Sequence, residues 1–296
     1  MKKYIFLFAF LCASTTLLAQ KTDSLLNSLS TDIKNEPVTI FKATRLILSQ
    51  SSETIKKKNL NFLVIHRFGD FSGKFGGGQT FFGLDAVADV YIGFEYGITD
   101  DLNIDIGRTT IGGLADLELK YAFLHQTTDG SQLAITALGQ VGARPYGSFA
   151  SLGDRISEFG QIIFAHKFSP DFSLQIAPSF INNNIPFPMI PGNDQQFFAV
   201  SAAARLKVSR HMGVLVDYAH PFSVFRQNGA NGFSDPLGIG LEMVTGGHVF
   251  TVNISNAKAI SEINYLNNTQ SDYLRGQYRI GFTISRMFDF NRKKTY

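Results

Sequence analysis

The sequence has no tryptophan and one cysteine, and only 17% of its 296 residues carry a charged side chain. Cys12 lies in an N-terminal stretch that we expect to be removed, so the mature chain should have no disulfide and no cysteine-bound metal. The net charge of the chain is only +3, whereas nucleic-acid-binding proteins usually carry a large excess of basic residues. After this stretch no apolar run approaches the ~20 residues of a membrane-spanning helix. The composition therefore argues against nucleic-acid binding and against membrane-spanning helices.

The N-terminus has the pattern of a secretory signal peptide. A basic start (residues 1–3) precedes an apolar stretch (residues 4–18), and the small residue Ala19 stands at the expected cleavage position. A lipoprotein anchored at Cys12 is the alternative, but the large side chain of Leu11 disfavours it. We therefore predict a signal peptide over residues 1–19 and export from the cytoplasm.

From residue 59 onward, apolar side chains alternate with polar or small ones in segments of about ten residues, which is typical of transmembrane β-strands. The 28 phenylalanines and 10 tyrosines would supply lipid-facing bulk and the interfacial aromatic rings. The alternation predicts an all-β, transmembrane antiparallel β-barrel of the outer-membrane type. About twelve strands are expected, over residues 60–68, 86–96, 102–107, 117–123, 133–141, 159–168, 172–180, 197–208, 214–218, 237–243, 249–255 and 278–285.

The connections between these segments alternate in length, as the periplasmic turns and outer loops of such barrels do. Short turns are expected at residues 97–101, 127–130, 169–171, 209–211 and 245–247. Longer connections are expected at residues 69–84, 142–157, 181–195, 220–235 and 256–275, with 109–115 as the short exception. A soluble β-sandwich or lipocalin-like barrel would also alternate, but it would bury the apolar face and would not need this rhythm.

Residues 20–58 precede the barrel, which we predict over residues 59–296. Leu25, Leu26 and Leu29 have helical spacing, so a short periplasmic helix and a disordered tail are both open. Residues 39–50 have a strand-like pattern and could form an extra strand or a plug in the lumen. Because an extra strand would make the strand count odd, the lumen or an unpaired lead-in is favoured.

Charged residues on the inward-facing positions are the candidate functional residues of the barrel. One interpretation is a polar permeation path, with acidic residues on the early strands facing basic residues on the later strands. The other is a salt-bridged core that fills a rigid, closed barrel. The candidates are Arg67, Asp89, Glu95, Asp105, Glu118, Lys120, Arg205, Lys207, Asp217, Glu242 and Arg279.

No constellation of catalytic or metal-binding residues is evident, so we predict no catalytic residues, metal or cofactor. The histidines are scattered singly, and none forms a metal-binding pair along the sequence. A lipid-modifying enzyme would need a nucleophile beside a histidine, and no Gly-x-Ser-x-Gly motif is present. The loop over residues 185–191 combines three prolines with apolar side chains, and it could be a lid over the mouth, bind a hydrophobic ligand or pack against neighbouring loops. Its candidate residues are Pro186, Phe187, Pro188, Met189 and Pro191.

Several short motifs resemble those of an uncharacterised outer-membrane β-barrel family of Bacteroidota. The similarity is greatest over residues 41–125. It implies a porin-like barrel in the outer membrane of a Gram-negative cell and no known activity. The motifs are Phe41-Lys42-Ala43-Thr44-Arg45, His66-Arg67-Phe68-Gly69, Gly83-Leu84-Asp85, Tyr96-Gly97-Ile98-Thr99-Asp100 with Leu102, and Gly107-Arg108.

These patterns predict a non-enzymatic barrel that passes or binds a small polar or amphipathic solute. A closed barrel with a structural or partner-docking role is the first alternative, and a lipid-modifying enzyme is the second. The expected partners are outer-membrane lipid, the barrel-assembly machinery and the solute.

Overall fold

The computed structural model describes residues 35–73, 75–184, 194–226 and 232–290. The chain from Pro37 onward forms one compact unit. The predicted signal peptide, the helical spacing at Leu25 to Leu29 and the proline-rich loop candidates Pro186 to Pro191 all lie outside the described residues, so these remain predictions.

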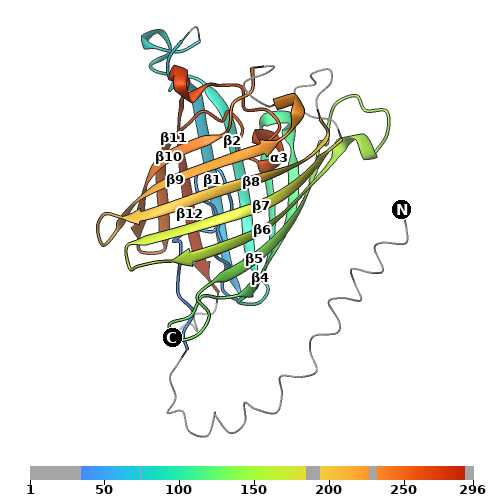
Figure 1. The fold of residues 1–296 in the computed structure, drawn as a ribbon. Helices are drawn as coiled ribbons and strands as arrows, with labels where there is room; N and C mark the ends of the chain where they lie inside the picture. The colour runs from blue at the N-terminus through green and yellow to red at the C-terminus, as the bar shows by residue number, and fades with distance from the viewer. Residues whose placement is uncertain (1–34, 74, 185–193, 227–231, 291–296) are drawn as a thin grey trace, which may run out of the picture. The chain divides into compact units, whose positions relative to one another are not determined.

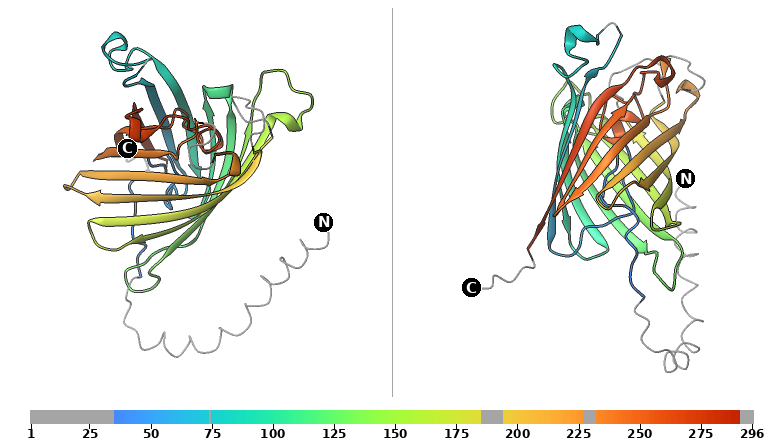
Figure 2. Two further views of the ribbon diagram at one scale, coloured as in Figure 1. Left: turned by 45° about the horizontal axis from the view of Figure 1, so that its top comes forward. Right: turned by 90° about the vertical axis from the view of Figure 1, so that its left-hand side faces the viewer.

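Twelve antiparallel strands form a closed barrel in which each strand pairs with its neighbours in sequence and β1 pairs with β12 (Figures 1 and 2). This confirms the predicted fold class, and every predicted strand is present. The strands are β1 (Asn59–Asp70), β2 (Val87–Gly97), β3 (Leu102–Thr109), β4 (Ala115–Leu124), β5 (Ala134–Ala143), β6 (Ile156–Lys167), β7 (Phe172–Asn183), β8 (Gln196–Lys207), β9 (Met212–Phe222), β10 (Leu237–Thr245), β11 (His248–Ser255) and β12 (Arg279–Asp289).

The connections alternate in length as predicted. We call the end of the barrel with the connections 98–101, 125–133, 168–171, 208–211 and 246–247 the short-turn end, and the opposite end the long-loop end. At the long-loop end, the short exception 110–114 contains the 3-10 helix η2 (Ile111–Gly113). Other short helices there are η1 (Gly78–Thr80), η3 (Gly153–Arg155), α3 (Glu262–Tyr265) and η5 (Tyr273–Arg275). Among the described residues, no helix is long and apolar enough to cross a membrane.

The outward face of the strands is apolar and exposed. Large side chains such as Phe94, Ile106, Leu119, Ile176 and Leu241 each expose more than a third of their surface. A soluble protein rarely exposes so continuous an apolar surface, whereas a barrel in lipid requires it. The soluble alternative therefore does not fit this barrel.

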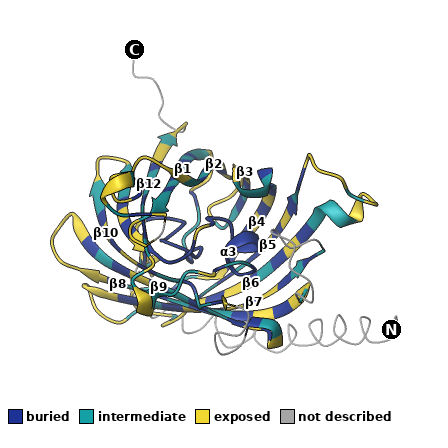
Figure 3. Ribbon diagram, turned by 90° about the horizontal axis from the view of Figure 1, so that it is seen from above, coloured by how far each residue is buried: buried dark blue, intermediate teal, exposed yellow. Residues whose placement is uncertain are grey.

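The inward face is buried and falls into two sides. Polar side chains and glycine predominate on β2–β4 and β10–β12, and β1 adds the apolar Leu63 and Ile65. Strands β5–β9 also turn apolar side chains such as Phe159, Ile163 and Leu215 inward. Figure 3, which looks down the barrel, shows that buried chain segments occupy its interior. On the β5–β9 side, apolar wall residues pack against an inserted segment of the chain, so charged residues are not the only contacts of the interior.

Candidate functional site in the barrel interior

Residues 37–58, which we call the inner hairpin, run into the barrel from the short-turn end and return to it before β1 begins. At the start of the hairpin, Val38 N–H donates to the Gln126 carbonyl in the connection between β4 and β5 (2.8 Å). At its end, Lys58 N–H donates to the Gly97 carbonyl (2.8 Å). The strand-like pattern of residues 39–50 does not form a thirteenth strand, since only the isolated bridges Pro37 to Thr127 and Arg45 to Gln50 involve this region.

The tip of the inner hairpin is fixed by the barrel wall. Two of its own backbone bonds close the tip, from Leu46 N–H to Ser49 O (2.9 Å) and from Ser51 N–H to Thr44 O (2.8 Å). The buried carboxylate of Asp217 on β9 then accepts hydrogen bonds from the N–H groups of Leu48 and Ser49, both at 2.8 Å. A wall carboxylate therefore satisfies backbone donors that the turn leaves unpaired.

One side of the inner hairpin is apolar and joins the hydrophobic core of the barrel. Ile40, Phe41, Leu46 and Leu48 are buried, and they cluster with the inward apolar residues of β5–β9. At the base of this side, the Glu53 carboxylate accepts hydrogen bonds from the N–H groups of Ile40 (2.8 Å) and Phe41 (3.1 Å). Burial raises the pKa of Glu53, and these hydrogen bonds oppose the rise.

A second segment fills the barrel from the long-loop end. Residues 256–269, which we call the inner loop, are almost entirely buried and contain helix α3. Ala257, Ala259, Ile263, Tyr265 and Leu266 belong to the same hydrophobic cluster as the inner hairpin. The prediction of an ordinary outer loop over residues 256–275 is therefore wrong for its first half, because these apolar residues bury themselves inside the barrel.

Two arginines join the inner hairpin to the inner loop. Arg45 at the hairpin tip forms an ion pair with Glu262 of α3 (3.1 Å), and neither side chain exposes more than 2% of its surface. Arg67 on β1 donates to the carbonyls of Ala257 (2.9 Å) and Ala259 (2.7 Å) through one nitrogen and to that of Ile47 (2.9 Å) through the other. The two inserted segments are thus tied to each other and to the wall.

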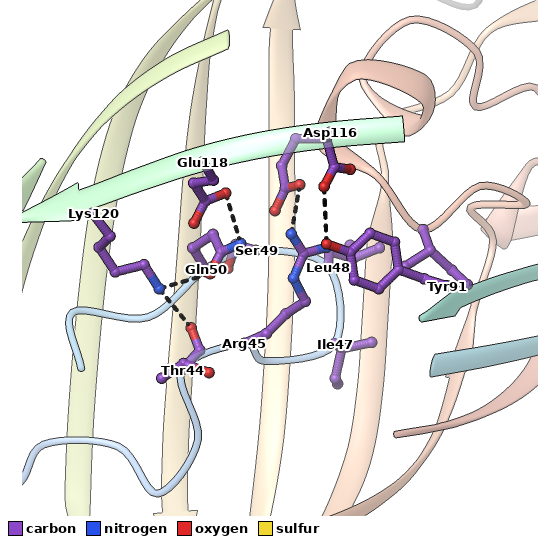
Figure 4. A network of polar contacts seen from close by, with 12 residues as sticks. Thr44, Arg45, Ile47, Leu48, Ser49, Gln50, Tyr91, Asp116, Glu118 and Lys120 are labelled. Carbon is purple, nitrogen blue, oxygen red and sulfur yellow. Dashed lines mark hydrogen bonds and ion pairs between the residues drawn. The ribbon is translucent and has the colours of Figure 1, made fainter. Parts of the chain in front are cut away.

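Arg45 also lies among other groups of the wall (Figure 4). Its guanidinium carbon is 5.0 Å from the ring centre of Tyr91, whose hydroxyl donates to Asp116 (3.1 Å). Burial alone would lower the pKa of Arg45, but the surrounding acidic groups, Glu262 first, raise it above its ordinary value. Arg45 therefore stays charged, and its interactions depend on the buried carboxylates around it.

A row of carboxylates crosses three adjacent strands on the wall that faces the hairpin tip. Glu95, Asp105 and Glu118 occupy paired positions on β2, β3 and β4. Glu95 accepts from Thr44 Oγ1 (2.6 Å), and Glu118 accepts from the Gln50 amide (3.1 Å).

Lys120 follows Glu118 by two residues on the same face of β4, so it lies beside this row, and it binds the inner hairpin. Its ammonium group donates to Gln50 Oε1 (2.7 Å) and to the Thr44 carbonyl (3.2 Å) (Figure 4). The hairpin is therefore the main polar partner of this part of the wall. Glu95 and Glu118 bind to it as acceptors, and Lys120 binds to it as a donor.

The other inward candidates take different partners. Arg205 and Glu242 form the one ion pair that the described residues show between two of the candidates (2.6 Å). Asp89 accepts from Ile260 N–H of the inner loop (2.9 Å). Arg279 pairs with Asp70 at the long-loop end (2.5 Å). Lys207 lies at a strand end, where its half-exposed side chain pairs with Asp171 of a short turn (3.1 Å).

The structure does not place an acidic wall opposite a basic one. Asp217 and Glu242 lie on the later strands, and most inward charges bind an inserted segment or a neighbouring group on their own side. Four further buried residues of this network were not among the candidates predicted from the sequence: Arg45, Tyr91, Asp116 and Glu262. Arg45 lies before β1 and Glu262 lies between β11 and β12, so neither belongs to a strand whose inward face alternation could assign. Asp116 and Tyr91 follow the alternation of their strands, so the inward register could have identified them.

The histidines do not assemble a catalytic site in the described part of the chain. His66 on the outward face stacks on Phe282, with ring centres 5.3 Å apart. His125 bonds to Asp101 (2.7 Å) and His220 to Asp235 (2.9 Å), and neither ring hydrogen-bonds to a serine or threonine hydroxyl among the described residues. Nor do these residues include a cluster of three or more histidine, cysteine, aspartate or glutamate side chains that could hold a metal ion. No contact here favours the lipid-modifying alternative.

The closed barrel with an apolar outer face defines a membrane β-barrel protein. The sequence matches, over residues 41–288, the family described as "Membrane bound beta barrel domain (DUF5777)", and the chain belongs to this family. The Bacteroidota origin expected from the motifs stays a prediction. Among curated proteins, none matches the sequence.

Several solved structures are similar in fold. The COG4313 outer membrane channel from Pseudomonas putida F1 has a TM-score of 0.49 and 10% identity, covering 80% of this chain and 98% of that chain. The NanC porin has a TM-score of 0.46 and 8% identity, with 77% and 98% covered. The KdgM porin has a TM-score of 0.46 and 6% identity, with 78% and 99% covered. At these identities the resemblance concerns the fold alone.

Proposed function

We propose that this protein is a non-enzymatic outer-membrane barrel for the passage of a small polar or amphipathic solute, and that the inner hairpin closes it in the state described. The apolar outer face and the expected export signal support the outer membrane as its location. Outer-membrane lipid and the barrel-assembly machinery are then its expected partners.

One observation carries the proposal: the inner hairpin fills the barrel without forming a ladder with any strand. Closure of the barrel rests on the pairing of β1 with β12 and β2, which begins at Asn59 and Leu60, after the hairpin ends. The hairpin can therefore leave the interior without breaking a strand pair. Its departure would expose Glu95, Asp105, Glu118 and Lys120 to the lumen and so create a charged wall along a water-filled path.

A closed barrel with a structural or partner-docking role is the second candidate. The packing of Phe41, Leu46 and Leu48 into the hydrophobic core favours it, because such burial is typical of a permanent core. The two candidates differ in one measurable property: only the first predicts that ions pass when the hairpin is absent.

Planar-bilayer conductance of three forms of the exported chain separates the candidates. The forms are the whole mature chain, a variant without residues 21–36, and a variant without residues 21–53. We expect steady current from the third form and little from the first two, because only the third lacks residues 37–53, which include the tip of the inner hairpin and its apolar side. The second form controls for shortening of the chain. If a folded third form, shown by heat-dependent mobility on a gel, stays as silent as the others, the closed barrel is correct.

A further inference from the structure

A pocket at the long-loop end lies outside the interior network. Its volume is about 610 Å³, within the range of small-molecule sites, and it is formed by the connection after β1 and the connection between β11 and β12. Its lining includes Asp70, Phe75, Lys258, Gln270, Gln277 and Arg279.

The lining carries one more positive than negative charge. Arg279 is neutralised by Asp70, with 2.5 Å between Nη2 and Oδ1. Lys258 is exposed, and the described residues show no ion pair to it. An ammonium group of this kind favours a ligand with a negative charge, and a carboxylate would complete a charge-assisted hydrogen bond with it.

The uncharged part of the lining favours a ligand that also carries hydroxyl groups. Gln277 Oε1 accepts from Asp272 N–H (2.7 Å), which leaves the amide nitrogen as a donor, and Gln270 is an exposed amide that can both donate and accept. Among the described residues, these amides and the unpaired Lys258 ammonium together match a small polyhydroxylated carboxylate.

The pocket also lies directly above the segment that closes the barrel. Lys258 stands between Ala257 and Ala259, whose carbonyls both accept from Arg67. The same guanidinium binds Ile47 at the hairpin tip. A ligand in the pocket would therefore contact the outermost layer of the structure that fills the lumen.

We propose that this pocket is the recognition site for the solute, and that the solute is a small sugar acid or a similar hydroxyl-bearing carboxylate. The choice of solute class rests on the proposed function, whereas the existence of the site does not. The site would concentrate the solute at the mouth of the barrel before passage.

Isothermal titration calorimetry of the folded full chain in detergent tests the site with three probes. D-glucuronate carries a carboxylate and hydroxyl groups, D-glucose only hydroxyl groups, and acetate only a carboxylate. We expect binding of D-glucuronate and at least tenfold weaker binding of the other two. Equal affinity for D-glucuronate and either control probe, or no binding of D-glucuronate, overturns the proposal.

Three variants locate the binding. Lys258→Gln removes the free cation, and Gln270→Glu adds a negative charge with almost no change of shape; each should weaken D-glucuronate binding about tenfold. Lys56→Gln, at the opposite end of the barrel, is the matched control and should bind as the unaltered chain does. Unchanged binding in both pocket variants overturns the assignment, and heat-dependent gel mobility shows that each variant is folded.

This assay measures binding without a membrane or a current, so the two proposals can fail separately. Binding without conductance in the hairpin-free form leaves the site standing and overturns solute passage. Conductance without D-glucuronate binding overturns the site and leaves passage standing.

Discussion

Arg45 and Glu262 lie 217 positions apart in the sequence, yet their side chains form a 3.1 Å ion pair inside the barrel. One belongs to a segment inserted from the short-turn end and the other to a segment inserted from the long-loop end. Their pairing makes the two insertions interdependent. A buried ion pair of this kind adds little net stability when intact, but removal of one partner is costly because it leaves the other charge uncompensated.

We therefore expect Arg45→Gln to weaken docking of the inner hairpin by about 3–5 kcal/mol, and Glu262→Gln to act in the same direction. The double variant should lose less than the sum of the two, because neither charge is then left alone. Hydrogen exchange of the hairpin amides measures each loss. Additive effects of the two substitutions would show that the ion pair does not couple the segments.

Asp217 supplies the second prediction. Its carboxylate accepts two backbone N–H groups at the hairpin tip, and Asp217→Asn replaces a charged acceptor by a neutral amide. Hydrogen bonds to charged groups contribute about 1.5–3 kcal/mol, so exchange of the Leu48 and Ser49 amides should accelerate about 10- to 150-fold.

The matched control is Asp171→Asn, which breaks the exposed ion pair with Lys207 (3.1 Å). Such pairs contribute about 0–1 kcal/mol, so the hairpin amides should keep their protection. An equal acceleration in both variants would mean that Asp217 acts through the general stability of the barrel and not by holding the tip.

The strands could be predicted from the sequence because each one buries one face and exposes the other, so alternation in segments such as residues 279–285 determines both structure and orientation. A place in the lumen is one of the favoured alternatives for residues 39–50, but the contacts of Arg45 and Leu48 could not be predicted from alternation. Their partners Glu262 and Asp217 lie far along the chain, and no sequence pattern relates this segment to particular wall residues.

The apolar inward residues also limit prediction from alternation. Phe159 and Ile163 on β6 face the interior, while Ile162 and Phe164 on the same strand face outward. A strand with apolar residues on both faces indicates that its inner side packs against something. Only the folded structure shows that the partners include Phe41, Leu46 and Ile263.

Arg67 gives the third prediction. Its guanidinium donates to three carbonyls at once, those of Ile47, Ala257 and Ala259. Lysine keeps the charge but has no planar fork that reaches all three. In Arg67→Lys we expect faster hydrogen exchange in both inserted segments, measured on peptides covering residues 44–52 and 256–262. Arg286→Lys, at an exposed position of β12, is the control. If exchange of the same two peptides is equally fast in the control variant, Arg67 has no special role in holding the inserted segments.

The last prediction concerns the space that Tyr91 occupies. Its ring lies against Gly107 on the neighbouring strand, and a methyl group at residue 107 would overlap the Tyr91 hydroxyl and ring. Gly107→Ala should therefore displace Tyr91 from beneath the Arg45 guanidinium and cost about 1–3 kcal/mol through overpacking. Gly139→Ala is the matched control, because nothing lies within 4 Å of the added methyl group there. If displacement of Tyr91 loosens the hairpin, the Gly107 variant should show faster exchange at residues 44–50 and more frequent openings in the bilayer, while the Gly139 variant behaves as the unaltered chain. Faster exchange without openings would mean that the inner loop alone keeps the barrel closed.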